Sequence, residues 1–545
     1  MERLLSEFFT PEIAKRAGLT AREGSTDPLI TGLEYDSRNV IPGNLFFALP
    51  GLHTDGSLYI NDAITRGAAA IVYEKAVIEK NSDIVFIHVE NSRFAMAPIA
   101  ASFYDFPSRR MPVIGVTGTE GKSTTVYLIW QLLTLMGKKA GFFSTVQCCL
   151  GSDVLWNSEH QTTPEAPVVQ KLLREMADNG CEFAVVEASS HGLSPKTNRL
   201  GDVNFCSAIL TNVMHEHLEF HGTWEQYRDD KANLFRTLDH YAPSAGSPVI
   251  EPFGIINADD KSSQFFTKVT QAKTTKYSAT GMDADIVLEA IESSAWGNWY
   301  LVSIPALNEH FDFRDKLPGA FNSGNVLAAL GTVSQLLNLP VREIVQCVKS
   351  LKPLRGRMTY INKGQPFELV VDYAHTPSSF QAIFPPLRSR LDKTRSRITA
   401  SDGVLNPSPR IISLFGSAGE RDTKKRFEQG KIAAVYSDII IITDEDPRGE
   451  DSMAILEDIA AGAEGTDAGG NKAVFKRNEN LFLIPERPAA IRKALSLARP
   501  TDIVLLLGKG HENSIIYADH IMPFDEITEA EKALDEMISH SDSAL

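Results

Sequence analysis

Residues 113–125 combine the residue types and spacing that phosphate binding needs. An apolar stretch ends in a turn with Gly118 and Gly121, then come Lys122 and Ser123, and apolar residues at helical spacing follow. In a strand–turn–helix of this kind, backbone N–H groups and the positive end of the helix dipole face the phosphates. Lys122 is suited to the outer phosphates and the Ser123 hydroxyl to Mg²⁺. This predicts a nucleotide-binding loop, and a chance glycine-rich turn is the alternative.

The loop departs from the usual phosphate-loop spacing at one position. The pattern has a glycine five residues before Gly121, where this chain has Val116, and its other glycines stand at 115 and 118. We expect a nucleotide to lie against the whole turn, which comprises Gly118, Thr119, Glu120, Gly121, Lys122, Ser123 and Thr124.

Polar residues also follow three later apolar stretches, each of strand length. Glu187 ends one stretch, residues 211–217 with His217 follow the next, and residues 257–260 follow the third. Because the carboxyl ends of parallel strands meet at one edge of a sheet, we expect these groups to converge near the phosphate loop. A carboxylate and an imidazole there suit Mg²⁺, which takes few protein ligands and keeps its waters. Each residue alone is more often a hydrogen-bonded strand end than a metal ligand, but the convergence of three polar loops beside the phosphate loop favours a metal site.

Two loops nearer the carboxyl terminus carry charges that suit an amino acid. Residues 444–450 (Asp-Glu-Asp-Pro-Arg-Gly-Glu) follow an apolar strand, and an arginine fork beside acids can bind both ends of a zwitterion. Residues 508–512 form a second such loop, which lacks the Ser or Thr of a phosphate loop. A solvated turn is the alternative interpretation of the first loop.

Three other positions have a structural interpretation beside the functional one. The trio at residues 36–38 (Asp-Ser-Arg) follows an apolar strand and is more often a turn than a ligand site. Lys231 lies on a predicted helix, where a lysine is normally a solvated charge. Arg357 follows a glycine at the expected boundary between two domains, from where it could swing onto ATP as the domains close.

The elements that must position these residues alternate between strands and helices. The pattern predicts an α/β fold with three domains: a small α/β domain at 1–108, a parallel sheet covered by helices at 109–354, and a second doubly wound domain at 355–545. Predicted helices cover 4–17, 60–66, 124–136, 165–179, 225–238, 377–387, 424–436, 453–461, 488–498 and 526–538. Predicted strands cover 69–73, 84–89, 112–115, 139–147, 183–188, 205–211, 254–257, 367–373, 410–415, 438–443, 481–484 and 502–507. Residues 393–409 and 462–472 are expected to be polar loop insertions.

Composition narrows the class of protein. The chain has 545 residues, which is too long for one core, and its 43% hydrophobic and 23% charged residues are those of a globular protein. A net charge of −15 argues against non-specific nucleic-acid binding. No apolar run approaches the roughly 20 residues that cross a bilayer. The five cysteines form no CxxC pair, which favours reduced thiols. We therefore expect a cytoplasmic protein without a membrane span. As a separate expectation, we take the protein to be a monomer.

The combination of motifs resembles the ATP-dependent Mur ligases of peptidoglycan synthesis, in particular the members that add the third residue of the peptide. The resemblance runs through all three domains in the family's order. It rests on the phosphate loop and on residues 162–164, 187–193, 211–212, 217–218, 221–222, 319–325, 356–358, 372–377 and 508–512. The likeness to the members that add the third residue rests on residues 36–38 and 446–448.

The resemblance implies a role for each site residue. UDP-N-acetylmuramoyl-dipeptide would bind the first domain near Ser37, with its peptide end on Thr162, Thr163, Ser189 and Arg199. ATP would contact the phosphate loop and also Asn322, Asn325 and Arg357, beside Asp372 and His375. The incoming diamino acid would meet Arg421, Asp446, Arg448, Gly508 and Glu512. Mg²⁺ would be held by Ser123, Glu187, His217 and Lys231, the last carbamylated by CO₂, and Lys122, Glu187, His217 and Lys231 would be the catalytic residues.

Two positions depart from the family pattern. Ser123 replaces the commoner threonine and keeps the hydroxyl. Asp446 stands where diaminopimelate-adding members usually have asparagine, and its charge suits a second ammonium. We therefore expect a diamino acid, and favour lysine or ornithine over meso-diaminopimelate.

Two other functions compete with this hypothesis. Folylpolyglutamate synthetase resembles the central domain but lacks an N-terminal UDP-sugar domain, for which this chain has residues 1–108. A regulatory ATPase with a phosphate loop would leave that domain and residues 444–450 without a role. Phosphate release that requires both a dipeptide acceptor and an amino acid would distinguish a ligase from a regulatory ATPase.

Overall fold

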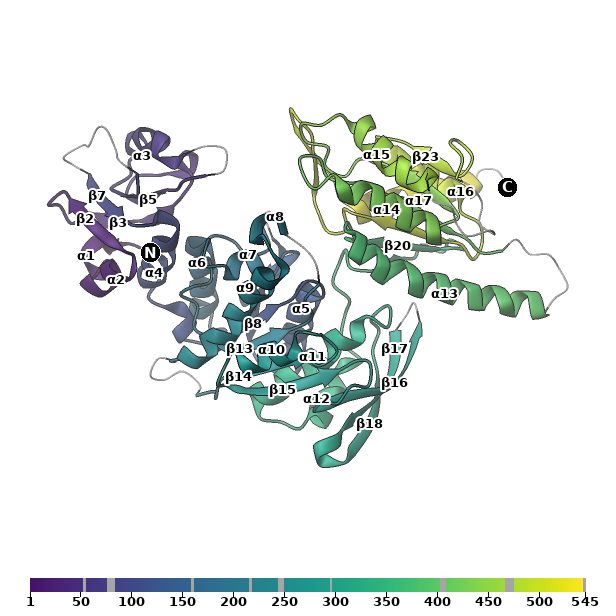
Figure 1. Cartoon of the computed structure of the whole chain (residues 1–545), viewed down its shortest axis with the longest axis horizontal. Coiled ribbons are helices and arrows are strands. Elements are labelled where there is room, and N and C mark those ends of the chain that lie inside the picture. Colours follow the sequence, from purple (N-terminus) through teal and green to yellow (C-terminus); the bar gives the residue numbers. More distant parts are fainter. Residues whose placement is uncertain are drawn as a thin grey trace. The chain divides into compact units, whose positions relative to one another are not determined.

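The chain folds into two compact units (Figure 1). The computed structural model describes residues 1–51, 55–75, 84–157, 161–214, 218–243, 249–294, 297–401, 408–465 and 475–542. The first unit comprises Met1–Ile291, Trp299–Asp315 and Asn322–Leu351, and the second comprises Glu292–Asn298, Lys316–Phe321 and Lys352–Leu545. In the described part of the chain, no helix is long and apolar enough to cross a membrane.

A five-stranded sheet near the amino terminus has the order β2-β7-β6-β5-β4. Its strands are β2 (Leu19–Glu23), β4 (Gly32–Glu34), β5 (Asn44–Ala48), β6 (Ala70–Tyr73) and β7 (Val85–Val89), of which only β2 runs antiparallel to its neighbour. The side chains of β5 alternate between two cores: Leu45 and Phe47 face α1 (Leu5–Phe8), α2 (Pro11–Arg16) and α4 (Ser92–Phe103), whereas Phe46 faces α3 (Ile60–Thr65). A two-stranded sheet joins β1 (Arg3–Leu4) to β3 (Leu29–Ile30).

The single helix predicted over residues 4–17 is wrong, because the structure has two short helices there. Pro11 restricts Thr10 to an extended conformation, with φ −69° and ψ 164°. The Thr10 hydroxyl then accepts the N–H of Ile13 and caps the second helix. The chain therefore turns between α1 and α2 instead of continuing one helix.

The central sheet has eleven strands in the order β11-β10-β9-β12-β8-β13-β14-β15-β16-β17-β18. Parallel pairs run from β9 to β16, whereas β9–β10, β10–β11 and β17–β18 are antiparallel. The strands are β8 (Val113–Thr117), β9 (Ala140–Phe143), β10 (Gln147–Cys149), β11 (Val154–Trp156), β12 (Phe183–Glu187), β13 (Phe205–Leu210), β14 (Phe253–Asn257), β15 (Lys273–Ser278), β16 (Ile286–Ser294), β17 (Gly297–Ile304) and β18 (Glu309–Arg314).

The fully parallel sheet predicted for this region is therefore correct only at its centre. The strand predicted over 139–147 is divided into β9 and β10 by a tight turn, in which Ser144 bonds to the carbonyl of Gln147 through both its N–H and its hydroxyl. So short a connection joins only antiparallel strands. Helices α6 (Ala166–Asp178) and α9 (Trp224–Thr237) share one core with the sheet, and α5 (Lys122–Leu135) packs against α11 (Asn322–Leu337). Shorter helices are α7 (Ser190–Leu193), α8 (Leu218–His221), α10 (Ser263–Lys268) and α12 (Val341–Val348).

The second unit contains a six-stranded sheet with the order β19-β20-β24-β21-β22-β23. The strands are β19 (Thr359–Ile361), β20 (Glu368–Asp372), β21 (Ile411–Phe415), β22 (Ile439–Ile442), β23 (Leu481–Leu483) and β24 (Ile503–Leu507), and only β19 is antiparallel. Helices α13 (Pro377–Ser401), α14 (Lys424–Tyr436) and α15 (Ser452–Glu464) cover one face. Helices α16 (Arg487–Leu497) and α17 (Glu526–Asp542) cover the other. A hairpin, β25 (Ser514–Ile516) with β26 (Ile521–Pro523), follows β24.

Helix α13, the long green helix in Figure 1, is longer than its sequence pattern indicated. It was expected to end at residue 387 and to be followed by a loop insertion at 393–409, but it continues to residue 401 even with Pro385 and Pro386 inside it. The expected loop is therefore helical in its first half. Most of the second expected insertion, at 462–472, lies outside the described residues.

Candidate active site

The phosphate loop of the first unit lies between β8 and α5, as predicted. Gly118 has φ +151° and Gly121 has φ +83°, backbone angles that residues other than glycine rarely adopt. A Cβ atom added to Gly118 would lie 1.8 Å from the Thr211 hydroxyl oxygen, and one added to Gly121 would lie 2.5 Å from Asn325 Oδ1. The turn therefore accepts only glycine at both positions.

Two residues after β13 hold the phosphate loop in place. The Asn212 carbonyl accepts the N–H of Thr119 at 2.8 Å, and its side-chain oxygen accepts the N–H of Glu120 at 2.9 Å. The Glu120 carbonyl accepts the Thr211 hydroxyl at 2.6 Å and the Asn212 side-chain amide at 3.1 Å. All of these partners are uncharged, so neutral hydrogen bonds to the loop backbone shape the loop before any phosphate binds.

The amino end of α5 supplies donors for an anion. The first bond into the helix joins the N–H of Thr125 to the Gly121 carbonyl, and the N–H groups of the preceding helical residues have no carbonyl within the helix to pair with. These are Lys122, Ser123 and Thr124, all of them predicted phosphate ligands. The Lys122 ammonium bends back to the Thr119 carbonyl at 2.7 Å, so it remains beside the turn.

Ser123 and Glu187 meet next to this turn. The Ser123 hydroxyl donates to Glu187 Oε2 at 2.8 Å, and the N–H of Thr145 donates to the same oxygen at 2.7 Å. Two hard oxygen donors therefore converge where the sequence predicts Mg²⁺. His217, the third predicted ligand, lies outside the described residues. No group of three or more His, Cys, Asp or Glu side chains suited to a metal occurs in the part of the chain that the structure describes.

Lys231 is buried beneath the phosphate loop. Only 1% of its surface is exposed, its ammonium donates to the Gly118 carbonyl at 2.7 Å, and it lies 4.3 Å from the centre of the Tyr227 ring. The solvated lysine that its position on a helix suggested is therefore not what the structure contains. Because β8 and α9 are remote in sequence, helical spacing gave no signal of this contact.

The residues assigned to the peptide acceptor form one network that starts at Glu187. The Glu187 carbonyl accepts the Thr163 hydroxyl at 3.0 Å, which in turn accepts the Ser189 hydroxyl at 2.9 Å. Arg199 donates to the Thr163 carbonyl at 2.8 Å and to Glu165 at 2.9 Å. Thr162 joins this network because its hydroxyl oxygen accepts the Thr145 hydroxyl at 3.1 Å. The phosphate loop and this network therefore share Glu187.

Asn322 and Asn325 begin α11 beside the same turn. Asn325 accepts the Thr125 hydroxyl at 3.1 Å and donates to Asn322 Oδ1 at 3.1 Å. Ser37, by contrast, lies in the amino-terminal sheet region, on a short 3₁₀ turn (Ser37–Asn39) after β4. Its neighbours Asp36 and Arg38 bond to each other, and this arginine lowers the pKa of Asp36.

A buried histidine near Lys231 was not singled out as a site residue in its own right. His221 Nδ1 lies 2.6 Å from Asp230 Oδ2, and its Nε2 lies 3.1 Å from the Ser190 hydroxyl. Burial alone would raise the pKa of Asp230, but hydrogen bonds from His221 and Gln226 bring it below its ordinary value. This contact ties the helix that carries Lys231 to the turn after β12.

In the second unit, Arg357, Asp372 and His375 gather around Tyr373. The Arg357 guanidinium lies 4.7 Å from the centre of the Tyr373 ring, and His375 Nδ1 lies 2.9 Å from the Tyr373 carbonyl. The Asp372 carboxylate accepts the N–H groups of Met358 and Ala374 at 2.7 and 2.8 Å. Burial raises the pKa of Asp372, although the positive charge of Arg357 acts against that increase.

The loops after β21, β22 and β24 lie at the carboxyl edge of the same sheet. Asp446 and Glu512 both bond to the buried Lys509. Arg448 adopts φ +54°, and its N–H donates to the carbonyl of Ile516 at 2.9 Å. Arg421 is exposed on the loop after β21, while Gly508 directly follows β24. The predicted amino-acid residues thus share one edge of this sheet.

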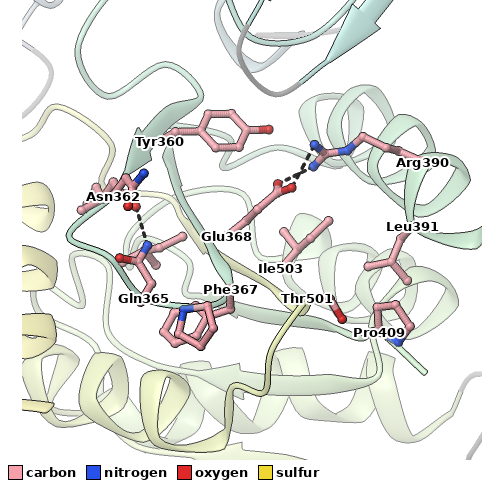
Figure 2. A pocket seen from close by; sticks show the side chains of 13 residues that line it. Tyr360, Asn362, Gln365, Phe367, Glu368, Arg390, Leu391, Pro409, Thr501 and Ile503 are labelled. Atoms are coloured by element: carbon pink, nitrogen blue, oxygen red, sulfur yellow. Dashed lines mark hydrogen bonds and ion pairs between the residues drawn. The ribbon is translucent and has the colours of Figure 1, made fainter. Parts of the chain in front are cut away.

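A cavity of about 400 Å³ lies at the opposite edge of this sheet (Figure 2). Figure 2 shows Arg390 and Glu368 facing each other on its wall, bonded at 3.1 and 2.6 Å, with Tyr360 beside them. Burial raises the pKa of Tyr360 to about 12. The cavity lining contains none of the predicted site residues, and its charged groups are already paired.

Comparison with known proteins identifies the family of each region. Three family models match the chain: the Mur ligase family catalytic domain over 29–104, the Mur ligase middle domain over 116–333, and the Mur ligase glutamate ligase domain over 356–510. The UDP-N-acetylmuramyl-tripeptide synthetase of Treponema denticola is 49% identical over 530 residues, which are 94% of this chain and 95% of that protein. The UDP-N-acetylmuramoyl-L-alanyl-D-glutamate–2,6-diaminopimelate ligase of Geobacillus kaustophilus is 34% identical, over 94% of this chain and 96% of that one.

Solved structures agree with the sequence matches. A UDP-N-acetylmuramoyl-L-alanyl-D-glutamate–2,6-diaminopimelate ligase has a TM-score of 0.59 and 27% identity, over 93% of this chain and 95% of its own. The folylpolyglutamate synthase of Mycobacterium tuberculosis, at 15% identity and a TM-score of 0.55, covers 75% of this chain and 91% of its own. The second match shows a similar fold alone. The predicted three-domain α/β fold is confirmed.

Proposed function

Because the chain belongs to the Mur ligase family of ATP-dependent amide ligases, we propose that it joins a diamino acid to UDP-N-acetylmuramoyl-L-alanyl-D-glutamate. The observation that supports this most strongly is the double use of Glu187. Its side chain accepts the Ser123 hydroxyl of the phosphate loop, while its carbonyl accepts Thr163 of the acceptor network. A phosphoryl donor and a carboxylate acceptor bound at these two groups would lie side by side.

In the proposed reaction, an oxygen of the D-glutamate γ-carboxylate attacks the γ-phosphorus of ATP and ADP leaves. The neutral α-amine of the amino acid then attacks the acyl carbon, loses a proton, and displaces phosphate to form the amide. Lys122 and the N–H groups at the start of α5 neutralise the charge that builds on the transferred phosphoryl group. Excluding water protects the acyl phosphate from hydrolysis.

We propose that Ser123 and Glu187 hold Mg²⁺ together with His217. The hydroxyl and the carboxylate, 2.8 Å apart, are the oxygen donors that this ion prefers. Bound there, Mg²⁺ would supply positive charge to the β- and γ-phosphates.

Carbamylation of Lys231 by CO₂ is a second proposal for this site. The Lys231 amine fits it because it is buried against the phosphate loop, in a place where a charged ammonium is poorly solvated. The adduct would turn a cation into an anionic metal ligand. Lys231→Ala should lose activity that high bicarbonate cannot restore, and unchanged steady-state kinetics in this variant would contradict the assignment.

The remaining assignments complete the proposal. We assign ATP to the phosphate loop with Asn322, Asn325, Arg357, Asp372 and His375, and the UDP-sugar dipeptide to Ser37, Thr162, Thr163, Ser189 and Arg199. The amino acid is assigned to Arg421, Asp446, Arg448, Gly508 and Glu512. Lysine or ornithine remains favoured over meso-diaminopimelate. The five unpaired cysteines fit a reducing cytoplasm, where we place the reaction, and we propose a monomer.

The test is phosphate release by the full-length protein with UDP-N-acetylmuramoyl-dipeptide, ATP and each of lysine, ornithine and meso-diaminopimelate. We expect ADP and phosphate to form together with the amide, and only when all three substrates are present. Brisk ATP hydrolysis without the dipeptide would instead favour a regulatory ATPase. Ligation of glutamate to a folate in place of this reaction would favour a folylpolyglutamate synthetase.

A further inference from the structure

A buried acid at the start of α6 lies between two arginines from different parts of the first unit. Glu165 Oε1 is 3.0 Å from Arg93 Nη1, on α4, and 2.9 Å from Arg199 Nη2, on the segment between α7 and β13. The side chains of Glu165 and Arg199 are 7% and 15% exposed, and that of Arg93 is 24% exposed. We name Arg93, Glu165 and Arg199 the Glu165 bridge. Of these three residues, only Arg199 is assigned to the peptide acceptor.

The Glu165 bridge is part of a packed contact between the amino-terminal sheet region and the central sheet. Glu165 occupies the N-cap position of α6, but its side chain makes no capping bond and bonds to the two arginines instead. The next residue, Ala166, belongs to the same core as α4. The Phe94 carbonyl accepts the Asn198 side-chain amide at 3.2 Å, so the segments that carry the two arginines are also joined directly.

Arg93 also reaches the edge of the amino-terminal sheet to which the UDP-sugar is assigned. Its Nη2 donates to the carbonyl of Pro50, in the loop after β5, at 3.4 Å. Strand β5 pairs in parallel with β4, and Ser37 follows β4. Because the carboxyl ends of parallel strands meet at one edge of a sheet, the loops that carry Pro50 and Ser37 share that edge. Arg93 therefore connects this edge to the acceptor network through Glu165.

The pairing of Glu165 with Arg199 is incomplete. The two side chains share one bond, while Glu165 Oε2 and Arg199 Nε are buried and have no hydrogen-bond partner within the described structure. A carboxylate and a guanidinium that pair only with each other commonly form two parallel bonds. Here Arg93 shares Oε1, and Arg199 also donates to the Thr163 carbonyl at 2.8 Å. The bridge contains two cations and one anion, so one positive charge remains for a bound anion.

We propose that Arg93 is a positioning residue for the peptide acceptor: by sharing Glu165, it keeps the Arg199 guanidinium available to a carboxylate of the dipeptide. This inference rests on the proposed function, in which Arg199 binds the acceptor. Without Arg93, Glu165 would form two parallel bonds with Arg199 and neutralise its charge. A residue beside the UDP-sugar site thereby sets the affinity for the other end of the same substrate.

The test measures steady-state kinetics of the full-length protein and its R93M variant. The substrates are UDP-N-acetylmuramoyl-L-alanyl-D-glutamate, ATP and whichever of lysine, ornithine and meso-diaminopimelate the parent uses. We expect the KM for the dipeptide substrate to rise about tenfold in R93M, because a charged hydrogen bond from Arg199 to the substrate is lost. The kcat and the KM for ATP should stay within about twofold of the parent values, because only binding of the acceptor is weakened.

A double variant separates this electrostatic role from a purely structural one. In R93M/E165Q the acid that would neutralise Arg199 is also absent, so the KM for the dipeptide substrate should return to the parent value. A structural contact would give the opposite result, because the double variant loses both halves of it. R342M is the matched control: Arg342 is exposed and lies 3.9 Å from Glu309 in the same unit, and its loss should leave this KM unchanged.

A conservative variant carries the test if R93M folds poorly. R93K keeps the positive charge beside Glu165, so the KM for the dipeptide substrate should rise by no more than about threefold. Urea unfolding midpoints show which of the variants are folded. R93K and R93M/E165Q then test the proposal without R93M.

A parental KM in R93M would overturn the proposal, and so would a raised KM that persists in R93M/E165Q or a rise in R93K as large as that in R93M. A loss of kcat together with a raised KM for ATP would overturn it too, because both would mean a structural role. A folded parent that ligates no amino acid would instead overturn the proposed function and, with it, this inference.

Discussion

The phosphate loop of the first unit and the charged loops of the second unit keep their shapes by different means. Around the phosphate loop, uncharged groups of Thr211 and Asn212 bond to the loop backbone. In the second unit, buried ion pairs hold the loops: Lys509 pairs with Asp446 and Glu512, and Arg487 pairs with Glu526. The first arrangement leaves its charged lysine and helix end for a ligand. In the loops of the second unit, most of the charged side chains are paired with one another.

This difference decides how each region responds to mutation. Losing a neutral hydrogen bond costs about 0.5–1.5 kcal/mol, whereas removing one partner of a buried ion pair costs about 3–5 kcal/mol, because the other charge stays buried and unpaired. Mutations in the second unit's loops should therefore affect folding, while those at the phosphate loop should affect catalysis first.

The largest effect is expected from Arg487→Met. Both Arg487 and Glu526 are fully buried, and Arg487 also donates to the carbonyls of Asp444 and Leu507 at 2.9 and 2.7 Å. The variant should lose about 3–5 kcal/mol of stability, measured by urea unfolding. Arg477→Met, which removes an exposed arginine bonded to Glu457 and Glu464, is the control and should leave the unfolding midpoint unchanged. Equal unfolding midpoints in the two variants would contradict the larger contribution of the buried ion pair to stability.

Lys122→Ala should lower kcat by about 10²–10³-fold, because the variant lacks the cation beside the transferred phosphoryl group. Its unfolding midpoint should match that of the parent, since the only protein bond of Lys122 among those described is to the Thr119 carbonyl. Rapid-quench and steady-state assays measure the rate. A purified, folded variant with parental activity would contradict the phosphate-loop assignment.

Asn212→Ala should have a smaller effect, because only neutral bonds are lost. The substitution removes the side-chain bonds to the N–H and carbonyl of Glu120, and leaves the Asn212 backbone bond to Thr119. We expect a loss of about 1–2 kcal/mol in ATP binding, read as a roughly tenfold higher Kd by calorimetry. A Kd equal to that of the parent would mean that the loop keeps its shape without the two side-chain bonds of Asn212.

The smallest effect is on the pH dependence of stability, and its sign should differ between Asp230 and Asp372. The pKa of Asp230 is lowered in the fold, so its contribution to stability is present above its ordinary pKa and is lost as the pH falls through the folded value. Burial raises the pKa of Asp372, so its ionisation penalises the fold above that raised value, and protonation relieves the penalty. The Asp230→Asn variant should therefore be less stable than the parent chain at pH 7. The Asp372→Asn variant should be stabilised relative to the parent at the same pH.

Urea midpoints between pH 3.5 and 7 measure both differences against the parent chain. Each difference should shrink as the pH falls, because protonation makes the parent resemble the variant. Differences of the same sign at pH 7 would contradict the opposite environments of the two carboxylates.

Local sequence patterns predicted most of the elements, but missed several helices and strands, one break at a proline, and the contacts between residues remote in sequence. The strand and helix around the phosphate loop were predicted because apolar periodicity and glycine positions are local signals. Sequence patterns did not predict α4, α11 or β15 to β18, and gave no break between α1 and α2, where a single proline redirects the chain. At the site, Lys231 was assigned through the family resemblance alone, because its position on a helix indicated a solvated charge and no local pattern indicates a contact with Gly118 across 113 positions.

The sequence by itself determined the phosphate loop, the family resemblance and the charged residues available to each loop, because these depend on residue type and short spacing. Only the tertiary structure decided which charges pair. It buried Lys231 against the turn, joined Ser123 to Glu187, and neutralised Asp446 with Lys509. The physical reason is that an ionic or hydrogen bond depends on distance in space and on exclusion of water, and a linear order of residues specifies neither.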